Sequence, residues 1–232
     1  MTKQKACIIG YGRFGQVFEK MLEPGFEVSI IKRLTDEDAA AKISNAEFIF
    51  PCVPIRLFEE VITELVPMLK SGQTVADVCS VKLYPKKILE QHLPSGVNGV
   101  LTHPLFGPDS IKQESVHKVM MCPLNEPTPG YQTLKAFFNE KPFKLLEMSA
   151  EEHDREAAHS QAVTHFIGRS LDKAGLEPTY AITTVGYERL MAVKEQTCND
   201  SAELFEDMLR FNPYAKEVLD GLIEAFGVII SA

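Results

Sequence analysis

A histidine and a serine each follow a short apolar run, at the kind of position where a parallel sheet binds its ligand. His103 lies in the stretch THPLFGP, after the run Gly99–Thr102, and Ser80 lies in DVCSVK, after Thr74–Val78. Ligands of doubly wound sheets bind beyond the carboxyl ends of the strands. A histidine there can act as a general base near pH 7, whereas Ser80 also suits a helix N-cap. His103 is therefore a candidate general base or hydrogen-bond partner, with a structural histidine as the alternative. Ser80 is well placed beside a ligand, and a role as N-cap is both its alternative and compatible with that position.

A second group of polar residues lies far downstream, in the stretch SQAVTHF. Ser160, Gln161, Thr164 and His165 recur there at helical spacing among apolar neighbours. Residues three and four positions apart share one face of a helix, so these side chains can point toward a common cleft. The row predicts the lining of a substrate pocket, and the alternative is a satisfied polar seam between helices.

A glycine-rich turn near the N-terminus predicts a dinucleotide site. Gly10, Gly12 and Gly15 follow the run Ala6–Ile9 and precede a helical pattern. In such a turn the first glycine permits the bend, the second admits the pyrophosphate and the third lets helix and strand pack closely. The N-terminus of the helix offers free N–H groups to the phosphates. The predicted cofactor contacts are Gly10, Tyr11, Gly12, Arg13, Phe14 and Gly15 in the turn, Lys32 and Arg33 after the second strand, and Cys52, Val53 and Pro54 after the third.

The end of the second strand indicates which dinucleotide is bound. Sites for NAD place an acid about 20 residues beyond the turn, where it accepts hydrogen bonds from the ribose hydroxyls. Here the stretch VSIIKRL carries Lys32 and Arg33 instead. Two cations suit the 2′-phosphate of NADP, whereas the alternative is a solvated pair of charges at a strand end. We therefore expect NADP as the cofactor.

Alternating strands and helices position these residues in the first part of the chain. Segments with helical spacing, such as IRLFEEVITELVPML, separate several of the strand-like runs. This alternation predicts a Rossmann-type, doubly wound, mainly parallel sheet that forms a dinucleotide-binding domain over residues 1–148. The strand-like runs are Ala6–Ile9, Glu27–Ile31, Glu47–Pro51, Thr74–Val78, Gly99–Thr102, Lys118–Cys122 and Phe143–Glu147.

From about Ser149 onward the strand signals stop. Ser149 and Glu152 form a capping-box pattern, and Gly175 is a plausible stop, so one long helix is expected between them. Further helices are expected around 183–196, 200–211 and 214–229. Residues 149–232 are thus predicted to form an all-helical domain that binds substrate and pairs with a second copy to make a homodimer.

The composition restricts the partners and the compartment. The chain has 232 residues and a net charge of −8, which argues against a nucleic-acid partner because phosphates require clustered cations. Its five cysteines show no CxxC spacing, so buried free thiols in a reducing compartment are expected. The sequence shows no signal peptide, no apolar run of about 18 residues and no HExxH or Cys-pair spacing. We expect a cytoplasmic protein without a membrane span or a metal site.

Several stretches together resemble the prephenate/arogenate dehydrogenase family of tyrosine biosynthesis, and the short plant-type arogenate dehydrogenases in particular. They are GYGRFGQ, DVCSVKLYPKKILEQHLP, THPLFGPDS, EMSAEEHDREAAHSQAVTHFIGRSL and TTVGYERLMAVKEQTCNDS. The joint order of the THPLFGP and SQAVTH motifs is more specific than either motif alone. The resemblance implies an NADP-dependent oxidative decarboxylation of arogenate, prephenate or both, in which the ring becomes aromatic.

The resemblance also implies roles for individual residues. His103 would bind the 4-hydroxyl of the substrate, and Ser80 would orient His103 or lie beside the nicotinamide. Gln161, Thr164 and His165 would contact the substrate. Arg189 is the first candidate to hold a substrate carboxylate, in competition with Arg169 and Lys194. An acid near the side chain of the substrate would favour arogenate and an amide would tolerate prephenate, and the sequence offers both Asn199 and Asp200.

Two other functions stay open at this point. One is another NADP-linked dehydrogenase with a helical second domain, of the β-hydroxyacid dehydrogenase or imine reductase type, although THPLFGP would then be unexplained. The other is a non-catalytic protein that senses NADP, since a fold alone does not fix a function.

Overall fold

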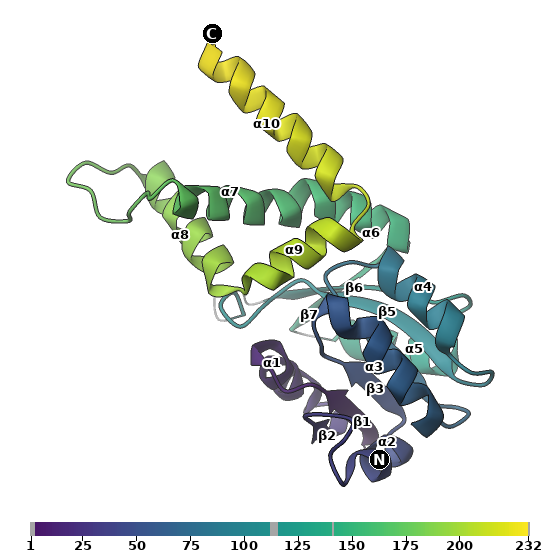
Figure 1. Cartoon of the computed structure of the whole chain (residues 1–232). Coiled ribbons are helices and arrows are strands. Elements are labelled where there is room, and N and C mark those ends of the chain that lie inside the picture. The colour runs from purple at the N-terminus through teal and green to yellow at the C-terminus, as the bar shows by residue number, and fades with distance from the viewer. Residues whose placement is uncertain (1–2, 112–115, 141, 232) are drawn as a thin grey trace. The chain divides into compact units, whose positions relative to one another are not determined.

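The chain folds into two compact units, Met1–Ala150 and Glu151–Ala232. The computed structural model describes residues 3–111, 116–140 and 142–231. In Figure 1 the strands belong to the first unit, whereas the second unit is built from helices. The predicted fold class, a Rossmann-type sheet followed by helices, is confirmed.

A seven-stranded sheet, in the order β2-β1-β3-β4-β5-β6-β7, forms the centre of the first unit. Neighbouring strands from β2 to β5 are parallel, whereas β6 runs antiparallel to β5 and β7 runs parallel to β6. Each predicted strand is present, with ends that differ by one or two residues. The strands are β1 (Gln4–Ile9), β2 (Phe26–Ile31), β3 (Phe48–Pro51), β4 (Thr74–Asp77), β5 (Asn98–Pro104), β6 (His117–Pro123) and β7 (Phe143–Glu147).

Helices connect the strands of this unit. The segment predicted as one helix from Ile55 to Leu69 contains the shorter helix α3, flanked by the 3₁₀ turns Ile55–Leu57 and Val66–Met68. Pro67 lies in the second turn and has no N–H to continue an α-helical ladder. The α-helices are α1 (Arg13–Leu22), α2 (Ala39–Asn45), α3 (Phe58–Leu65), α4 (Leu83–His92) and α5 (Pro129–Phe138).

The core of the first unit lies along the middle of the sheet. Strands β3 and β4 are buried at every residue, as expected for parallel strands covered on both faces. Phe18 of α1 packs edge-on against Phe50 of β3, with ring centroids 5.2 Å apart. This packing holds α1, and the glycine turn that precedes it, against β3.

The second unit begins with one continuous helical path, in which the hydrogen-bonding pattern changes from α-helical to π-helical and back. The segment Ala158–Ala162 between α6 and α7 is a π-helix, which sequence periodicity does not predict. The path ends as predicted at Gly175, which has a φ of 69° and whose N–H donates to the Asp172 carbonyl oxygen. The helices are α6 (Ala150–Ala157), α7 (Val163–Lys173), α8 (Val185–Asn199), α9 (Ala202–Phe211) and α10 (Ala215–Ser231).

Helices α7 and α8 approach each other closely at Gly168. A Cβ atom at this position would lie only 2.1 Å from Thr197 Oγ1 and 3.0 Å from the Val193 carbonyl oxygen. A glycine is therefore required at residue 168, and it brings the end of α8 next to the middle of α7.

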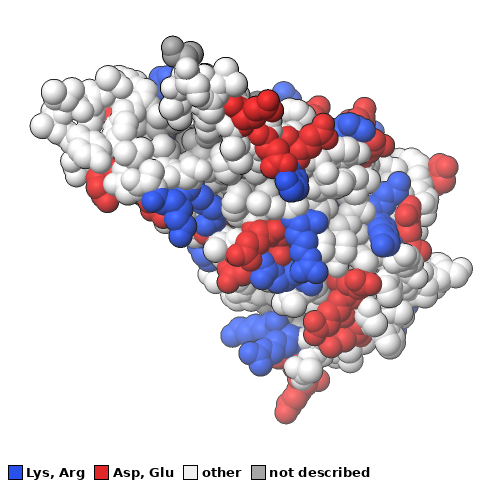
Figure 2. All heavy atoms as spheres, turned by 45° about the horizontal axis from the view of Figure 1, so that its top comes forward, with Lys and Arg blue, Asp and Glu red and all other residues white. Residues whose placement is uncertain are grey.

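Two further properties of the described residues concern a membrane span and the distribution of surface charge. None of their helices is both long and apolar enough to cross a bilayer. Acidic and basic side chains lie intermixed on the face drawn in Figure 2.

Candidate active site

Ser80 and His103 lie at the carboxyl ends of neighbouring strands of the sheet. His103 lies in β5 opposite Met120 of β6 and is buried, with 4% of its surface exposed. Ser80 is half-buried in the segment between β4 and α4. Helix α4 begins at Leu83 with Lys82 in the N-cap position, so the alternative role of Ser80 as an N-cap is not realised.

A buried ion pair that the sequence analysis missed lies between these two residues. The Asp77 carboxylate and the Lys82 ammonium are in contact, and neither side chain is exposed to solvent. Asp77 Oδ1 accepts a hydrogen bond from Cys79 N at 2.9 Å, and Oδ2 accepts one from Thr102 N at 3.1 Å. Lys82 Nζ also donates to the Thr102 carbonyl oxygen at 2.6 Å. Burial raises the pKa of the Asp77 carboxyl, and the Lys82 charge opposes that rise.

The glycine turn has the geometry that a pyrophosphate needs. Gly10 has a φ of 94°, and a Cβ there would lie 2.4 Å from the Cys52 carbonyl oxygen and 3.3 Å from Val53 Cγ1. A Cβ at Gly12 would meet nothing within 4 Å. Gly12 is the N-cap of α1 and makes no side-chain capping bond, which leaves the helix N-terminus open to an anion. The turn therefore fits a dinucleotide, and the structure places Cys52 and Val53 against it.

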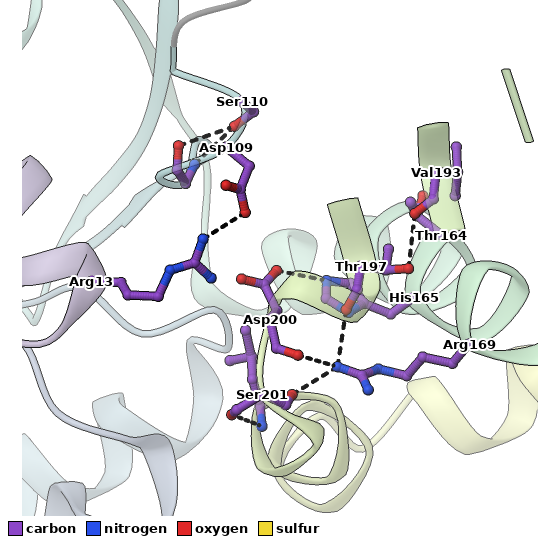
Figure 3. Close-up of polar contacts among 12 residues, drawn as sticks. Arg13, Asp109, Ser110, Thr164, His165, Arg169, Val193, Thr197, Asp200 and Ser201 are labelled. Atoms are coloured by element: carbon purple, nitrogen blue, oxygen red, sulfur yellow. Dashed lines mark hydrogen bonds and ion pairs between the residues drawn. The ribbon is translucent and has the colours of Figure 1, made fainter. Parts of the chain in front are cut away.

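The other predicted cofactor residues surround this turn. Tyr11 donates from its hydroxyl to Glu19 Oε2 at 2.6 Å, and Phe14 stacks on Phe18 of the same helix. Arg13 Nη2 donates to Asp109 Oδ2 at 2.7 Å, which connects the turn to the loop after β5 (Figure 3). Pro54 is exposed after β3.

The two cations at the end of β2 are exposed, and the nearby acid is used by the backbone. Asp36 Oδ2 accepts hydrogen bonds from Lys32 N at 3.0 Å and from Arg33 N at 3.1 Å. The side chains of Lys32 and Arg33 both lie in solvent. The loop thus presents cations, while its nearest carboxylate already binds two amides.

In the helical unit, the predicted polar row divides into two rows. Gln161 and His165 lie on one face of the helical path, together with Arg169. The side chains of the other row form hydrogen bonds within the helical path. Ser160 Oγ donates to the Glu156 carbonyl oxygen, and Thr164 Oγ1 donates to the Ser160 carbonyl oxygen. Both hydroxyl groups thus donate within the same helical path, and both lie where solvent reaches them.

His165 is the centre of the first row (Figure 3). Its Nε2 atom lies 3.8 Å from Asp200 Oδ2, and its ring lies parallel to that of Phe205 with centroids 6.2 Å apart. Burial, followed by the charge of Arg169, lowers the pKa of His165 from 6.5 to about 4. The imidazole is therefore neutral at pH 7, so its contact with Asp200 is not an ion pair there.

Three buried atoms of this face have no hydrogen-bond partner among the described residues: Gln161 Oε1, His165 Nδ1 and Arg169 Nε. Buried polar atoms are normally paired, so unpaired ones require an explanation such as a missing ligand or water. They lie on or just beyond the π-helix, a feature frequently found at functional sites. This face is therefore the candidate ligand surface of the helical unit.

The candidate cations for a substrate carboxylate differ in the hydrogen bonds that they already make within the chain. Arg169 Nη2 donates to the carbonyl oxygens of Thr197, Asp200 and Ser201 at 3.0, 2.9 and 2.7 Å. Lys194 Nζ donates to the Leu176 carbonyl oxygen at 2.6 Å. Arg189 is exposed on α8, about 16 Å along the helix axis from Asp200, so the structure does not bring it to the His165 face.

No group of three or more histidine, cysteine or acidic side chains within the described ranges could hold a metal ion.

The Rossmann-type sheet and the glycine turn define a dinucleotide-binding domain, which is joined to a helical unit. Residues 17–141 match the prephenate dehydrogenase, nucleotide-binding domain, and residues 170–231 match the TYRAAT1-like, C-terminal domain. The chain belongs to the prephenate dehydrogenase family.

Curated relatives agree with this membership. The chain is 33% identical to arogenate dehydrogenase 2, chloroplastic, of Arabidopsis thaliana, over 96% of this chain and 68% of that protein. It is also 33% identical to arogenate dehydrogenase 1 of the same plant, over 97% of this chain but only 38% of the relative. The chain is thus shorter than the relatives that it matches.

Solved structures share the fold. Prephenate dehydrogenase from A. aeolicus, in complex with hydroxyphenyl propionate and NAD+, has a TM-score of 0.74 at 19% identity and covers 100% of this chain and 91% of that one. Synechocystis arogenate dehydrogenase has a TM-score of 0.68 at 20% identity and covers 98% of this chain and 91% of that one.

Proposed function

We propose that this chain catalyses the NADP-dependent oxidative decarboxylation of arogenate to tyrosine, with prephenate as the alternative substrate and 4-hydroxyphenylpyruvate as its product. One observation carries the proposal: Ser80 follows β4 and His103 lies near the end of the adjacent parallel strand β5, at the sheet edge where the glycine turn lies. Family membership supports this reaction over that of a β-hydroxyacid dehydrogenase or imine reductase and over a non-catalytic NADP sensor.

The reaction needs one modest base and good positioning. A nicotinamide held at the glycine turn would supply the acceptor for the hydride of C4 of the cyclohexadienol ring. His103 hydrogen-bonds the 4-hydroxyl and assists the loss of its proton, while Ser80 orients the imidazole. Carbon dioxide leaves from C1, and its bonding electrons complete the aromatic ring. Because aromatisation supplies the driving force, the side chains act mainly by holding the reacting groups in place.

The helical face supplies substrate contacts in this proposal. Gln161 Oε1 and His165 Nδ1 are buried acceptors or donors that substrate groups would satisfy. Neutral His165 binds by hydrogen bonding, whereas the charge of Arg169 provides positive potential for a carboxylate. Thr164 contributes through the free lone pairs of its hydroxyl oxygen, and Arg189 takes no part in this arrangement.

Asp200 favours arogenate as the substrate. Asp200, and not the exposed Asn199, directs its side chain to His165, and 29% of the Asp200 side chain is exposed. A carboxylate at this face attracts the ammonium group of arogenate, whereas the neutral keto group that prephenate carries in its place gains no such attraction. The sequence left the choice between these two residues open.

The cofactor proposed is NADP. Lys32 and Arg33 present two exposed cations for a 2′-phosphate, and Asp36 already accepts hydrogen bonds from their backbone amides. An acid free to bind the ribose hydroxyls would have supported NAD instead.

A homodimer is proposed from the last helix. The second half of α10 exposes a run of large apolar side chains, a pattern that marks interaction surfaces. A second copy of the chain would cover it, and sedimentation showing a stable monomer at micromolar concentration would contradict this. The exposed apolar residues are Ile223, Phe226, Val228, Ile229 and Ile230.

A reducing compartment such as the cytoplasm suits the cysteines. Cys7, Cys52, Cys79, Cys122 and Cys198 are all free thiols. Burial raises the pKa of Cys52, which keeps that thiol protonated and unreactive.

The test is a parallel assay of reduced-cofactor formation with arogenate and prephenate, each with NADP and NAD. We expect turnover with arogenate and NADP to be fastest. His103→Ala should keep cofactor affinity while turnover falls about 10²- to 10⁴-fold, because general acid–base help is lost. His92→Ala, a partly exposed histidine on α4, is the matched control and should keep full turnover. A wild-type chain that oxidises neither substrate, or a His103→Ala variant with normal turnover, would overturn the proposal.

A further inference from the structure

We propose that the buried Asp77–Lys82 pair is a positioning device that fixes the backbone on which Ser80 and His103 are carried. This inference rests on the proposed function, which assigns the proton transfer to His103. Asp77 and Lys82 touch neither substrate nor cofactor in this proposal. They act through the main chain next to the two residues that do.

The contacts of the pair reach the residue immediately before each of those two. Asp77 Oδ1 binds the N–H of Cys79, which precedes Ser80. Asp77 Oδ2 binds the N–H of Thr102, which precedes His103. Lys82 Nζ binds both the Asp77 carboxylate and the Thr102 carbonyl oxygen, so one ammonium group connects the two strands. Charge-assisted hydrogen bonds of this kind are stronger than neutral ones.

The hydrogen bonds of the Asp77–Lys82 pair start at the residue where the ladder between β4 and β5 ends. The register between β4 and β5 runs from Thr74–Asn98 to Asp77–Leu101 and ends there. Beyond it, His103 is still paired with β6 on its other side, opposite Met120. On the β4 side, the N–H and the carbonyl oxygen of Thr102 bond to the side chains of Asp77 and Lys82, and the Thr102 hydroxyl donates to the Asp77 carbonyl oxygen. The ion pair therefore provides the main-chain hydrogen bonds of Thr102 at the point where the β-ladder with β4 ends.

Stability alone does not account for this choice of residues. Both side chains are fully buried, and a well-packed apolar pair of similar volume is often as stable as a buried ion pair, or more stable. An apolar pair, however, has no acceptor for the N–H groups of Cys79 and Thr102. What the charged pair adds is a defined position for two segments of backbone.

The experiment uses the double variant Asp77→Asn with Lys82→Met, which removes both charges and leaves no uncompensated one. We expect kcat to fall about 10²-fold, because displacements near 1 Å at a reacting group cost that much. The KM for NADP should change less than about twofold, because the glycine turn lies on β1 and α1. A loss of stability without a positioning role would lower the amount of active protein but leave kcat per bound cofactor unchanged.

Two further variants keep the test decisive. Asp77→Asn combined with Lys82→Gln also leaves no buried charge but retains a donor for the Thr102 carbonyl oxygen, so its kcat should lie between those of the wild type and of the variant with Lys82→Met. Lys86→Met removes a half-exposed lysine one turn further along α4 and should change nothing.

Hydrogen–deuterium exchange gives a readout that does not depend on activity. Exchange should accelerate in residues 78–82 and 101–104 of the variants while β1 stays protected. Equal exchange in these segments, or a wild-type kcat in both folded double variants, would overturn the inference. If the wild type turns over neither substrate, the proposed function fails, and the exchange data still decide the positioning role.

Discussion

The strongest quantitative prediction concerns the stability of the chain between pH 7 and pH 5. His165 is buried, and its pKa falls from 6.5 to about 4 because of burial and of the nearby Arg169 charge. The unfolded chain therefore binds a proton at this residue more readily than the folded chain does. Stability rises with pH wherever the unfolded state binds more protons, so this contribution is present above about pH 6.5 and is lost as the pH falls toward 4.

The size of the loss follows from the shift. Each pH unit below the ordinary value costs about 1.4 kcal/mol for one proton. At pH 5, about 1.5 units below 6.5 and still above the folded value, the folded chain has lost about 2 kcal/mol relative to neutral pH. His165→Gln removes the titrating group and should flatten the pH dependence of the free energy of unfolding by this amount.

The assay is urea denaturation of the wild type and the variant at both pH values, in which unfolding is monitored by the circular dichroism signal of the helices. His159→Gln is the matched control, because His159 is an exposed histidine on the same helical path. This control should keep the wild-type pH dependence. If His165→Gln loses as much stability between pH 7 and pH 5 as the wild type does, His165 is not the buried neutral imidazole that the structure shows.

The remaining predictions test the cofactor and the substrate. Gly10→Ala places a Cβ 2.4 Å from a backbone carbonyl at a φ of 94° and should abolish both cofactor binding and normal stability, whereas Gly12→Ala, whose Cβ meets nothing within 4 Å, should keep stability and weaken cofactor affinity alone. Thermal melts and fluorescence titration with NADPH separate the two. Lys32→Asp combined with Arg33→Ala should lower the preference for NADP over NAD at least about tenfold, since each lost phosphate contact is charge-assisted, and an unchanged ratio of kcat/KM values would remove that argument. Asp200→Asn should lower kcat/KM for arogenate relative to prephenate by about tenfold, because an attraction to the arogenate ammonium group worth roughly 1.4 kcal/mol is lost, and equal ratios in variant and wild type would show that Asp200 does not face the substrate side chain.

Much of the fold could be predicted because hydrophobic pattern and turn residues act locally. The strand-like runs were sufficient to place the strands, and Gly175 marked a helix end that needs a positive φ. The direction of β6 could not be predicted, since a strand buried in a sheet has the same pattern whether it runs parallel or antiparallel. The π-helix at Ala158–Ala162 was also beyond reach, because a single extra residue in one turn hardly disturbs the helical spacing.

The candidate site shows a different limit. His103, Ser80 and the glycine turn were found because their positions follow from strand ends. Asp77 and Lys82 lie within the same quoted stretch, DVCSVK, yet an acid and a lysine five residues apart are usually solvated. Only their burial at 0% exposure identifies them as a pair. An acid that ends an otherwise apolar strand was the one available signal.

The Asp77 carboxylate and the face formed by Gln161, His165 and Arg169 differ in how their buried polar groups are satisfied. In the sheet unit, both oxygens of the Asp77 carboxylate have donors, so this part of the site is fixed before any ligand arrives. In the helical unit, Gln161, His165 and Arg169 each bury a polar atom that has no partner among the described residues. Leaving a buried donor or acceptor unpaired costs about 1–3 kcal/mol, and a substrate that pairs these atoms recovers that energy as binding affinity. In the proposed reaction, the Asp77–Lys82 pair therefore fixes the backbone beside the reacting groups, whereas Gln161, His165 and Arg169 offer unpaired polar atoms to the substrate.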